Sequence, residues 1–348
     1  MGNEDQDRDW VATGGLNRLD RRTHSEGWIR FPAVPLLLDF YVRRIVLMFA
    51  AMGKKFDKDE IVTLRNLIEP RMRSGWAQSS HAKMMVSWVP EPYPATGIEY
   101  TVAVETSTTA SHYASWVDRD EPPFGPHPDS RAVHLAADYT PPYQSPILDI
   151  GAGVGRNALP LARLGYPVTA LDLTPEFCAA LEAAANTESL AVGVVCGNVI
   201  AEEAPQLPAS HYAMVLASEV TSHFRGPQEL RLFFERTTGW LRPGGTLLLN
   251  AFLGDVGFEP PPWLRQAAEV HWSWFLLRSE LVTCIEGLPL VLEAEHVLYD
   301  YEKQHYPGEW PPTAWYHDWS RGYDIVKVPD EGDHQPPFRM VWLTFRRT

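Results

Sequence analysis

The amino-acid sequence predicts an α/β fold built on a mostly parallel, doubly wound sheet. From residue 147 onward, short apolar runs typical of buried strands alternate with amphipathic stretches typical of helices. The first run, Ile147–Ile150, leads into glycines at alternate positions and then into a helical period. Glycine is favoured at such a turn because it adopts positive φ and lets a ligand approach the backbone. The turn therefore predicts a ligand site at the start of the following helix.

Composition and charge narrow the class of protein. The 348 residues are 45% hydrophobic and 21% charged, which is typical of a globular chain with one large domain or two ordinary ones. The net charge of −14 counts against a nucleic-acid partner, because the surface would repel phosphates. The most apolar segment, residues 31–52, is interrupted by Asp39, Arg43 and Arg44, so no membrane partner is expected. A polar N-terminus without signal-peptide features predicts a cytoplasmic protein.

The spacing of cysteine and histidine predicts neither a disulfide framework nor a metal site. The three cysteines, Cys178, Cys196 and Cys284, show no paired spacing. The twelve histidines form no H-x-x-x-H or H-E-x-x-H pattern. We therefore expect a protein without a bound metal.

The N-terminal part predicts a flexible arm followed by helices. Residues 1–30 are polar, as in a loose arm. Apolar residues then recur with a helical period over residues 34–52. A second helix is expected to begin at Asp57, with Glu60 completing a capping box, and to be disrupted at Pro70.

A hairpin and a domain boundary are expected next. Residues 83–88 and 98–104 alternate like paired strands around a Pro-rich loop. Together with the helices they predict a mainly helical cap or lid domain over residues 31–130, ahead of the sheet domain over residues 131–348. The cap helices also offer a possible homodimer contact.

The remaining elements follow the glycine turn in the order that a doubly wound sheet requires. Helices are expected over residues 174–184 and 227–240. Strands are expected over residues 168–171, 191–196, 212–217, 246–250, 290–298 and 338–345.

A long insertion separates the last two strands. Residues 299–337 are rich in Trp, Tyr, His and Pro, and a connection of that length inside a compact domain is usually functional. We interpret it, with the aromatic stretch that follows residue 250, as the wall or lid of an aromatic substrate pocket. The alternative is that its aromatic side chains merely pack against the N-terminal helices.

Two acids indicate the ligand. The turn reads G-x-G-x-G rather than G-x-G-x-x-G, and Asp149 just before it would repel a phosphate but attract an ammonium group. Asp172 ends the second strand, about twenty residues after the first glycine, which is the usual distance to a ribose-binding acid. One acid for an amine and one for a ribose, without a phosphate-binding Lys, describe S-adenosyl-L-methionine (SAM) better than a nucleotide.

These motifs resemble a known family. Residues 149–157 and 168–172 resemble motifs I and II of class I SAM-dependent methyltransferases, and the L-R-P-G-G turn at 241–245 resembles the turn before their fifth strand. The sequence GAGVGRN…LARLGYPVTALD is similar to that of the small-molecule branch of this family, which includes tellurite-resistance and thiopurine methyltransferase-like enzymes. The resemblance implies a Rossmann-like sheet with an antiparallel last strand, SAM as cofactor and S-adenosylhomocysteine (SAH) as product. The expected cofactor-binding residues are Asp149, Gly151, Ala152, Gly153, Gly155, Arg156, Asn157, Asp172, Leu173, Asn198, Val199, Ser218 and Tyr113.

One of these positions departs from the family pattern. The family usually has an Asp where Asn198 stands, with its side chain accepting from the adenine amino group. An Asn side chain still accepts through its amide oxygen and donates to a ring nitrogen. We therefore expect Asn198 to keep a cofactor contact.

Catalytic and acceptor residues are sought after the fourth and fifth strands. Glu219 and His223 follow the strand over residues 212–217 and would share one face if that loop turns helical, so both are candidate bases. The simpler interpretations are a hydrogen bond from a backbone amide or the cofactor to Glu219, and a capping or packing role for His223. The candidate acceptor-pocket residues are Trp116, Asn250, His271, Trp272 and Trp315.

The sequence thus predicts a SAM-dependent methyltransferase that modifies N, O or S of a small molecule or a short modified peptide, in specialised biosynthesis. One alternative is a thiol or metalloid methyltransferase of the tellurite-detoxifying kind. An alternative of another class is a SAM-binding partner protein without catalysis. A protein or RNA methyltransferase is disfavoured by the acidic charge.

Overall fold

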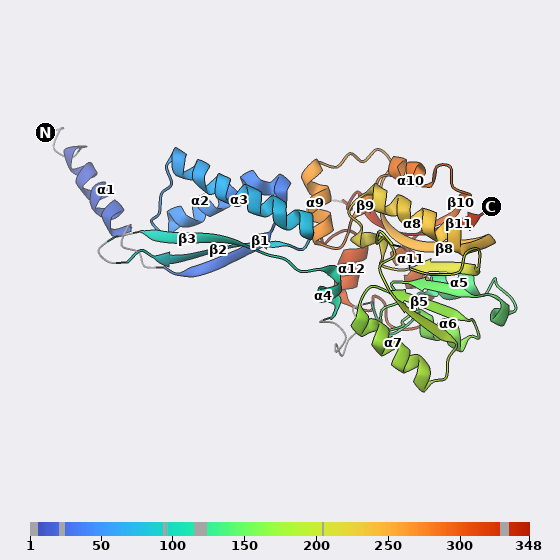
Figure 1. Cartoon of the computed structure of the whole chain (residues 1–348). Coiled ribbons are helices and arrows are strands. Elements are labelled where there is room, and N and C mark those ends of the chain that lie inside the picture. Colours follow the sequence, from blue (N-terminus) through green and yellow to red (C-terminus); the bar gives the residue numbers. More distant parts are fainter. Residues whose placement is uncertain are drawn as a thin grey trace. The chain divides into compact units, whose positions relative to one another are not determined.

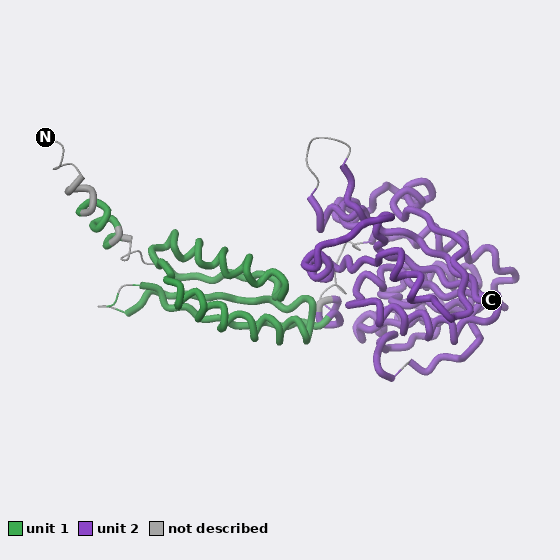
Figure 2. Tube along the Cα trace, turned by 90° about the horizontal axis from the view of Figure 1, so that it is seen from above, with its two compact units in different colours: residues 1–108 green, residues 109–348 purple. Residues whose placement is uncertain are grey.

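The computed structural model describes residues 6–20, 25–92, 95, 97–114, 124–203, 205–327 and 334–348. The chain divides into two compact units, residues 1–108 and 109–348 (Figure 2). The division falls before the boundary near residue 130 that the sequence indicated. Within the predicted loose arm, residues Gln6–Asp20 form helix α1 (Figure 1).

The first unit contains the two helices and the hairpin that the sequence indicated, and one further strand completes a three-stranded antiparallel sheet. Strands β1 (Gly27–Pro32), β2 (Lys83–Pro90) and β3 (Ile98–Glu105) include the predicted hairpin, and helices α2 (Leu38–Ala51) and α3 (Lys58–Gln78) pack on the sheet. Phe49 of α2 is fully buried, with its ring centroid 5.6 Å from those of Trp88 and Tyr100.

Helix α3 continues through Pro70, so the expected break there is wrong. The predicted capping box is present, because Asp57 accepts from the Glu60 amide and Glu60 accepts from the Asp57 amide. Leu64, Ile68 and Met72 are buried on both sides of the proline, and this packing holds the helix together where local propensity alone would end it.

The second unit contains the predicted sheet. Its strand order is β10-β11-β8-β7-β4-β5-β6, in which β4 to β8 are parallel and β11 is antiparallel to both of its neighbours. The order reverses between β4 and β7, and such switch points are where α/β sheets bind ligands. The strands are β4 (Ile147–Ile150), β5 (Val168–Asp172), β6 (Val192–Cys196), β7 (Tyr212–Ala217), β8 (Leu241–Gly254), β9 (Phe275–Leu276, paired with β8), β10 (Leu290–Val297) and β11 (Phe338–Arg347).

Helices cover both faces of this sheet (Figure 1). Along β7, Met214 and Leu216 contribute to one buried cluster while Val215 and Ala217 contribute to the other, as expected for a strand buried on both faces. In the described residues no helix combines the length and the apolar composition that a bilayer crossing needs. The helices are α4 (Thr109–Ala114), α5 (Ser130–Ala136), α6 (Ala158–Arg163), α7 (Pro175–Thr187), α8 (Pro227–Trp240), α9 (Pro262–Val270), α10 (Arg278–Ile285), α11 (Leu298–His305) and α12 (Ala314–Ser320).

The insertion before β11 packs on the core of the second unit. Trp319 of α12 is 1% exposed, and its ring lies 5.0 Å from that of Trp315 and 5.4 Å from that of Phe252. Glu302 of α11 accepts from the backbone amide of Ser130 at 2.8 Å and so holds the start of α5. The insertion is therefore an integral part of this domain's packing.

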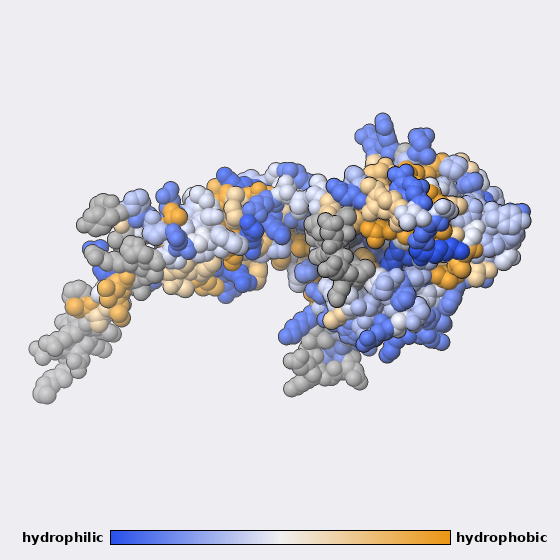
Figure 3. Space-filling model, turned by 90° about the horizontal axis from the view of Figure 1, so that it is seen from below, coloured by the Kyte–Doolittle hydropathy of each residue, from blue (hydrophilic) through white to orange (hydrophobic). Residues whose placement is uncertain are grey.

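Large apolar side chains are also exposed. On the face drawn in Figure 3, hydrophobic residues lie in several patches among hydrophilic ones. In the first unit the exposed ones include Leu36, Phe40, Leu47 and Val62.

Candidate active site

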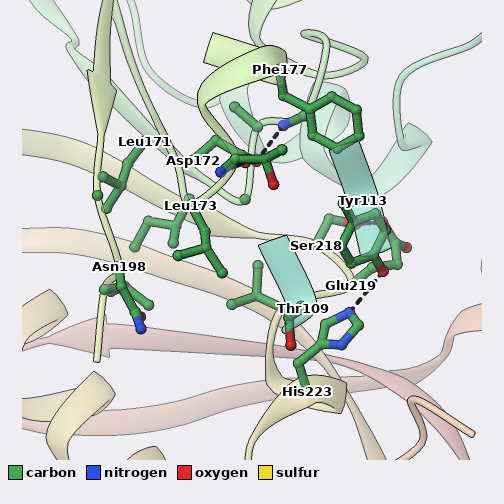
Figure 4. A pocket seen from close by; sticks show the side chains of 18 of the residues that line it. Thr109, Tyr113, Leu171, Asp172, Leu173, Phe177, Asn198, Ser218, Glu219 and His223 are labelled. Carbon is green, nitrogen blue, oxygen red and sulfur yellow. Dashed lines mark hydrogen bonds between the residues drawn. The ribbon is translucent and has the colours of Figure 1, made fainter. Parts of the chain in front are cut away.

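A cavity of about 320 Å³ lies at the carboxyl ends of β4, β5, β6 and β7 (Figure 4). Its wall comes from the glycine turn after β4, the end of β5, residues 197–200 and residues 218–224, together with Thr109 and Tyr113 of α4 and Phe124. The cavity therefore occupies the switch point of the sheet, where the sequence placed the ligand.

The glycine turn separates into a ligand-facing part and a packing part. Gly153 lines the cavity at φ +55°, and a Cβ atom there would meet nothing within 4 Å. Gly155, at φ +98°, is not part of the wall, and a Cβ atom there would lie 2.4 Å from the Leu181 side chain. Gly155 is thus needed for close packing of α6 against α7. Gly151 and Gly153 line the cavity, but a Cβ atom at Gly151 would lie 2.5 Å from the Val220 side chain, so only Gly153 has open space above it.

One end of the cavity, the Asp172 end, contains Asp172, Leu173, Asn198 and Val199 (Figure 4). The Asp172 carboxylate accepts from the backbone amides of Gly153 and Thr174, each at 2.8 Å, and burial raises its pKa. Asn198 Oδ1 accepts from the Ile200 amide at 2.9 Å, which leaves the Asn198 NH₂ group to donate. This end therefore presents a carboxylate and an amide donor, as a ribose and an adenine ring require.

Asp149 lies beneath the glycine turn and is not part of the cavity wall. It is 1% exposed, and burial raises its pKa to about 8. Its Oδ2 atom has no hydrogen-bond partner among the described residues. Asp149 therefore does not present its carboxyl group to the cavity.

The opposite end, the Glu219 end, contains Tyr113, Ser218, Glu219 and His223 (Figure 4). Tyr113 Oη and His223 Nε2 share a hydrogen bond of 3.0 Å. Burial, with the charges of Glu219 and Asp172, raises the pKa of Tyr113 well above its usual value, so the phenol stays protonated. A protonated phenol beside an imidazole can orient the ring for proton transfer.

Glu219 and His223 do not share a helix face, because the loop after β7 does not continue as a helix through both residues. Glu219 has φ +56°, which takes the chain out of a helical path before the short 3₁₀ turn Thr221–His223. The Glu219 carboxylate accepts from Arg156 Nη2 at 2.6 Å and Asn250 Nδ2 at 2.9 Å, and it lies 2.8 Å from Ser218 Oγ, whose single proton it shares with Asp129. Burial raises the pKa of Glu219 to about 7, which outweighs the opposite effect of Arg156.

Asp129 is a buried partner of the cavity-wall residues that the sequence analysis missed. It lies directly before α5, is 4% exposed, and accepts from Arg156 Nη1 at 2.5 Å and Ser218 Oγ at 2.7 Å. In the sequence, Asp129 shows only that it precedes a helix. Its partners Arg156 and Ser218 are 27 and 89 residues away. Sequence spacing carried no indication of this contact.

The candidate acceptor-pocket residues do not line the cavity. Asn250 is fully buried and binds Glu219 through both its Oδ1 and Nδ2 atoms. His271, Trp272 and Trp315 lie outside the wall; Trp272 accepts from Trp319 Nε1 through its carbonyl group, and Trp315 stacks on Trp319. Trp116 lies outside the described residues.

Other aromatic residues line the cavity instead. They come from the region before α5, from α7 and from the loop after β7: Phe124, Phe177 and Phe224. The Phe124 ring lies 5.9 Å from both Trp315 and Trp319, so the aromatic insertion supports the wall from behind. Of these three, Phe177 had a usable signal, since it opens the helix just after Asp172.

Comparison with known proteins agrees with this arrangement. Residues 147–245 match a family described as a methyltransferase domain. The ubiquinone biosynthesis O-methyltransferase of Bradyrhizobium diazoefficiens is 30% identical over 155 residues, which cover 42% of this chain and 58% of that protein. The enzyme of the same name from Xanthomonas campestris is 29% identical over 188 residues, covering 51% and 76%. A solved geranyl diphosphate C-methyltransferase from Streptomyces coelicolor aligns with 70% of this chain and 100% of its own at 11% identity and a TM-score of 0.46.

The fold, the motifs and the matched residues agree. The chain matches less than two thirds of the length of the first of these relatives, and the match falls on the sheet and the cavity. The strand order and the antiparallel β11 are those implied by the resemblance. Residues 147–245 therefore match a methyltransferase domain, and the sheet that contains them has the strand order and the antiparallel β11 that the resemblance implies.

Proposed function

We propose that this protein transfers the methyl group of SAM to an oxygen, nitrogen or sulfur atom of a small molecule or short modified peptide. The observation that carries the proposal is one cavity with a ribose- and adenine-compatible end at Asp172 and a Tyr113–His223 pair at the other end. The acidic net charge supports a small acceptor rather than a nucleic acid.

The residues of the cavity fit the cofactor. Asp172 would accept from the ribose hydroxyls and Asn198 would donate to an adenine nitrogen, while Asp149 stays behind the glycine turn. The open space over Gly153 lets a ligand approach the backbone. Bound SAM supplies a methyl group on a positively charged sulfur, and the protein has to align the acceptor atom with it.

His223 is the candidate base for an acceptor that carries a proton. It lines the cavity, and its hydrogen bond to Tyr113 holds the imidazole ring. Alignment alone supplies about 7–11 kcal/mol at best, and a base adds a factor of roughly 10²–10⁴. The relatives named O-methyltransferases favour a hydroxyl acceptor, and the neighbouring Phe124, Phe177 and Phe224 favour an apolar or aromatic one.

Cofactor binding is tested by calorimetry with SAM and SAH on the wild type and on Asp172→Ala. We expect measurable binding by the wild type and at least a roughly tenfold weaker binding by the variant, since it loses a charge-assisted contact. Asp138→Ala, an exposed acid outside the cavity wall, is the control and should bind like the wild type. No binding of either ligand by the wild type would overturn the proposal.

Turnover is tested by SAH release with a panel of phenols, amines and thiols. We expect release with at least one aromatic hydroxyl compound and a loss of roughly 10²-fold in His223→Ala. A thiol as the only active class would support the detoxifying alternative. Cofactor binding without SAH release from any acceptor would support a non-catalytic SAM-binding protein.

A further inference from the structure

Asp129 lies behind the cavity wall rather than in it. Its Oδ1 accepts from Arg156 Nη1 at 2.5 Å, and its Oδ2 accepts from Asn157 Nδ2 at 2.8 Å and from Ser218 Oγ at 2.7 Å. Its own backbone amide donates to Asn157 Oδ1 at 2.8 Å. Arg156, Asn157 and Ser218 all line the cavity, so this one carboxylate contacts three wall residues without being one.

Arg156 connects Asp129 to Glu219. One guanidinium nitrogen donates to Asp129, and the other donates to Glu219 at 2.6 Å. The guanidinium carbon lies 5.6 Å from the centre of the Phe124 ring. A long flexible side chain keeps one geometry only when both ends of its fork are bound, and here two carboxylates bind it.

We propose that Asp129 is a positioning residue of the methyl-transfer site: through Arg156 it fixes the orientation and the charge of Glu219 in the cavity wall. The inference rests on the proposed function. An amide at position 129 would not replace the carboxylate, because its NH₂ group would face donors. The backbone of Glu219, at φ +56°, is then held by its side-chain contacts.

The charges around Glu219 predict how its pKa responds to the loss of Asp129. Burial raises the pKa of Glu219 most, Arg156 lowers it and Asp129 raises it. Loss of the Asp129 charge should therefore lower this pKa. An ionised Glu219 favours the cationic SAM over the neutral SAH, so the affinity ratio of the two ligands should follow the Glu219 titration. The other titratable groups that interact electrostatically with Glu219 are Asp149 of β4, Tyr113 of α4 and Tyr316 of α12.

The first measurement is the SAM-to-SAH affinity ratio by calorimetry between pH 5.5 and 8.5. We expect the wild-type ratio to rise with a midpoint near the Glu219 pKa, and the midpoint of Asp129→Asn to lie about half a pH unit or more lower. Glu219→Gln should show no such transition. Glu302→Gln, which removes the buried α11 carboxylate that holds the start of α5, should lower the melting temperature and move the midpoint less than Asp129→Asn does.

The second measurement needs no ligand. Urea unfolding of Asp129→Asn, Glu219→Gln and the double variant should show non-additive destabilisation, because both residues act on Arg156. The inference would be overturned if the destabilisation of the double variant equalled the sum of the two single effects and the pH midpoint of the affinity ratio did not move in Asp129→Asn. If the wild type bound neither ligand, the proposed function would fail. The urea unfolding of the single and double variants would still decide whether Asp129 acts on Glu219.

Discussion

At the Asp172 end of the cavity, polar side chains are held by backbone amides, whereas at the Glu219 end they are held mostly by other side chains, several of them from distant segments. Thr174 and Ile200 each donate their amide to a side chain two residues earlier. Ser218 and Asp129, by contrast, are 89 residues apart. The first end depends on the path of the backbone, and the second depends on a balance of buried charges.

The largest effect that separates the two ends is expected from Arg156→Ala. Without the guanidinium group, the carboxylates of Asp129 and Glu219 remain buried and face each other without compensation. Breaking a buried ion pair in this way costs about 3–5 kcal/mol. We expect the free energy of unfolding in urea to fall by that amount.

Arg163→Ala is the matched control for this variant. Arg163 is the last residue of α6, the helix that follows Arg156. It pairs with Glu188 through two nitrogens, but both side chains are exposed. Exposed pairs contribute little to stability, so the unfolding midpoint should hardly move. Equal effects of the two variants would show that the Arg156 network is no more than a surface ion pair.

The second effect is a pH dependence of stability that belongs to the Glu219 end. The folded-state pKa of Glu219, about 7, lies above its unfolded value near 4.5. The stabilisation of the protonated form is therefore complete below the unfolded value and is lost as the pH rises through 7. We expect this contribution to reach up to roughly 3 kcal/mol between pH 5 and 8 and to be absent in Glu219→Gln.

Urea unfolding at several pH values measures this difference. Asp149 contributes a decline of the same sign in both proteins, since burial raises its pKa to about 8 as well. Only the difference between wild type and variant therefore reports on Glu219. Parallel curves would show that Glu219 stays ionised in the folded protein.

The same contrast explains how much the sequence predicted. The strands, the glycine turn and the Asp172 end follow from local patterns: alternating apolar runs, positive φ and an acid at a strand end. The Asp129 contacts join residues far apart in the chain, and no local pattern encodes them. The prediction that tryptophans of the aromatic stretches line the pocket failed for a related reason. A Trp that packs in the core and a Trp that lines a pocket recur at the same intervals in the sequence. Trp319 is fully buried, while Phe124 reaches the cavity.

A smaller effect is expected within the glycine turn itself. Gly155→Ala places a methyl group 2.4 Å from the Leu181 side chain at φ +98°, and should cost about 2–3 kcal/mol. Gly153→Ala meets no protein atom, so only the backbone strain of about 1 kcal/mol applies. Because Gly153 faces the cavity, its variant should lose SAM affinity more than stability. Calorimetry and urea unfolding of both variants test this, and equal losses of affinity would place Gly155 in the ligand site after all.

The smallest effect is expected at Asn198, where the chain departs from the family pattern. Asn198→Asp keeps an oxygen for the Ile200 amide and exchanges the NH₂ donor for a second acceptor, which suits the adenine amino group. We expect stability to change by no more than about 0.5 kcal/mol and SAM to bind within a few-fold of the wild type. Asn198→Leu, which removes both polar atoms, should bind SAM roughly tenfold more weakly. If the Asp variant lost as much affinity as the Leu variant, donation from the Asn198 NH₂ group to an adenine nitrogen would be the essential contact, and an acceptor could not replace it.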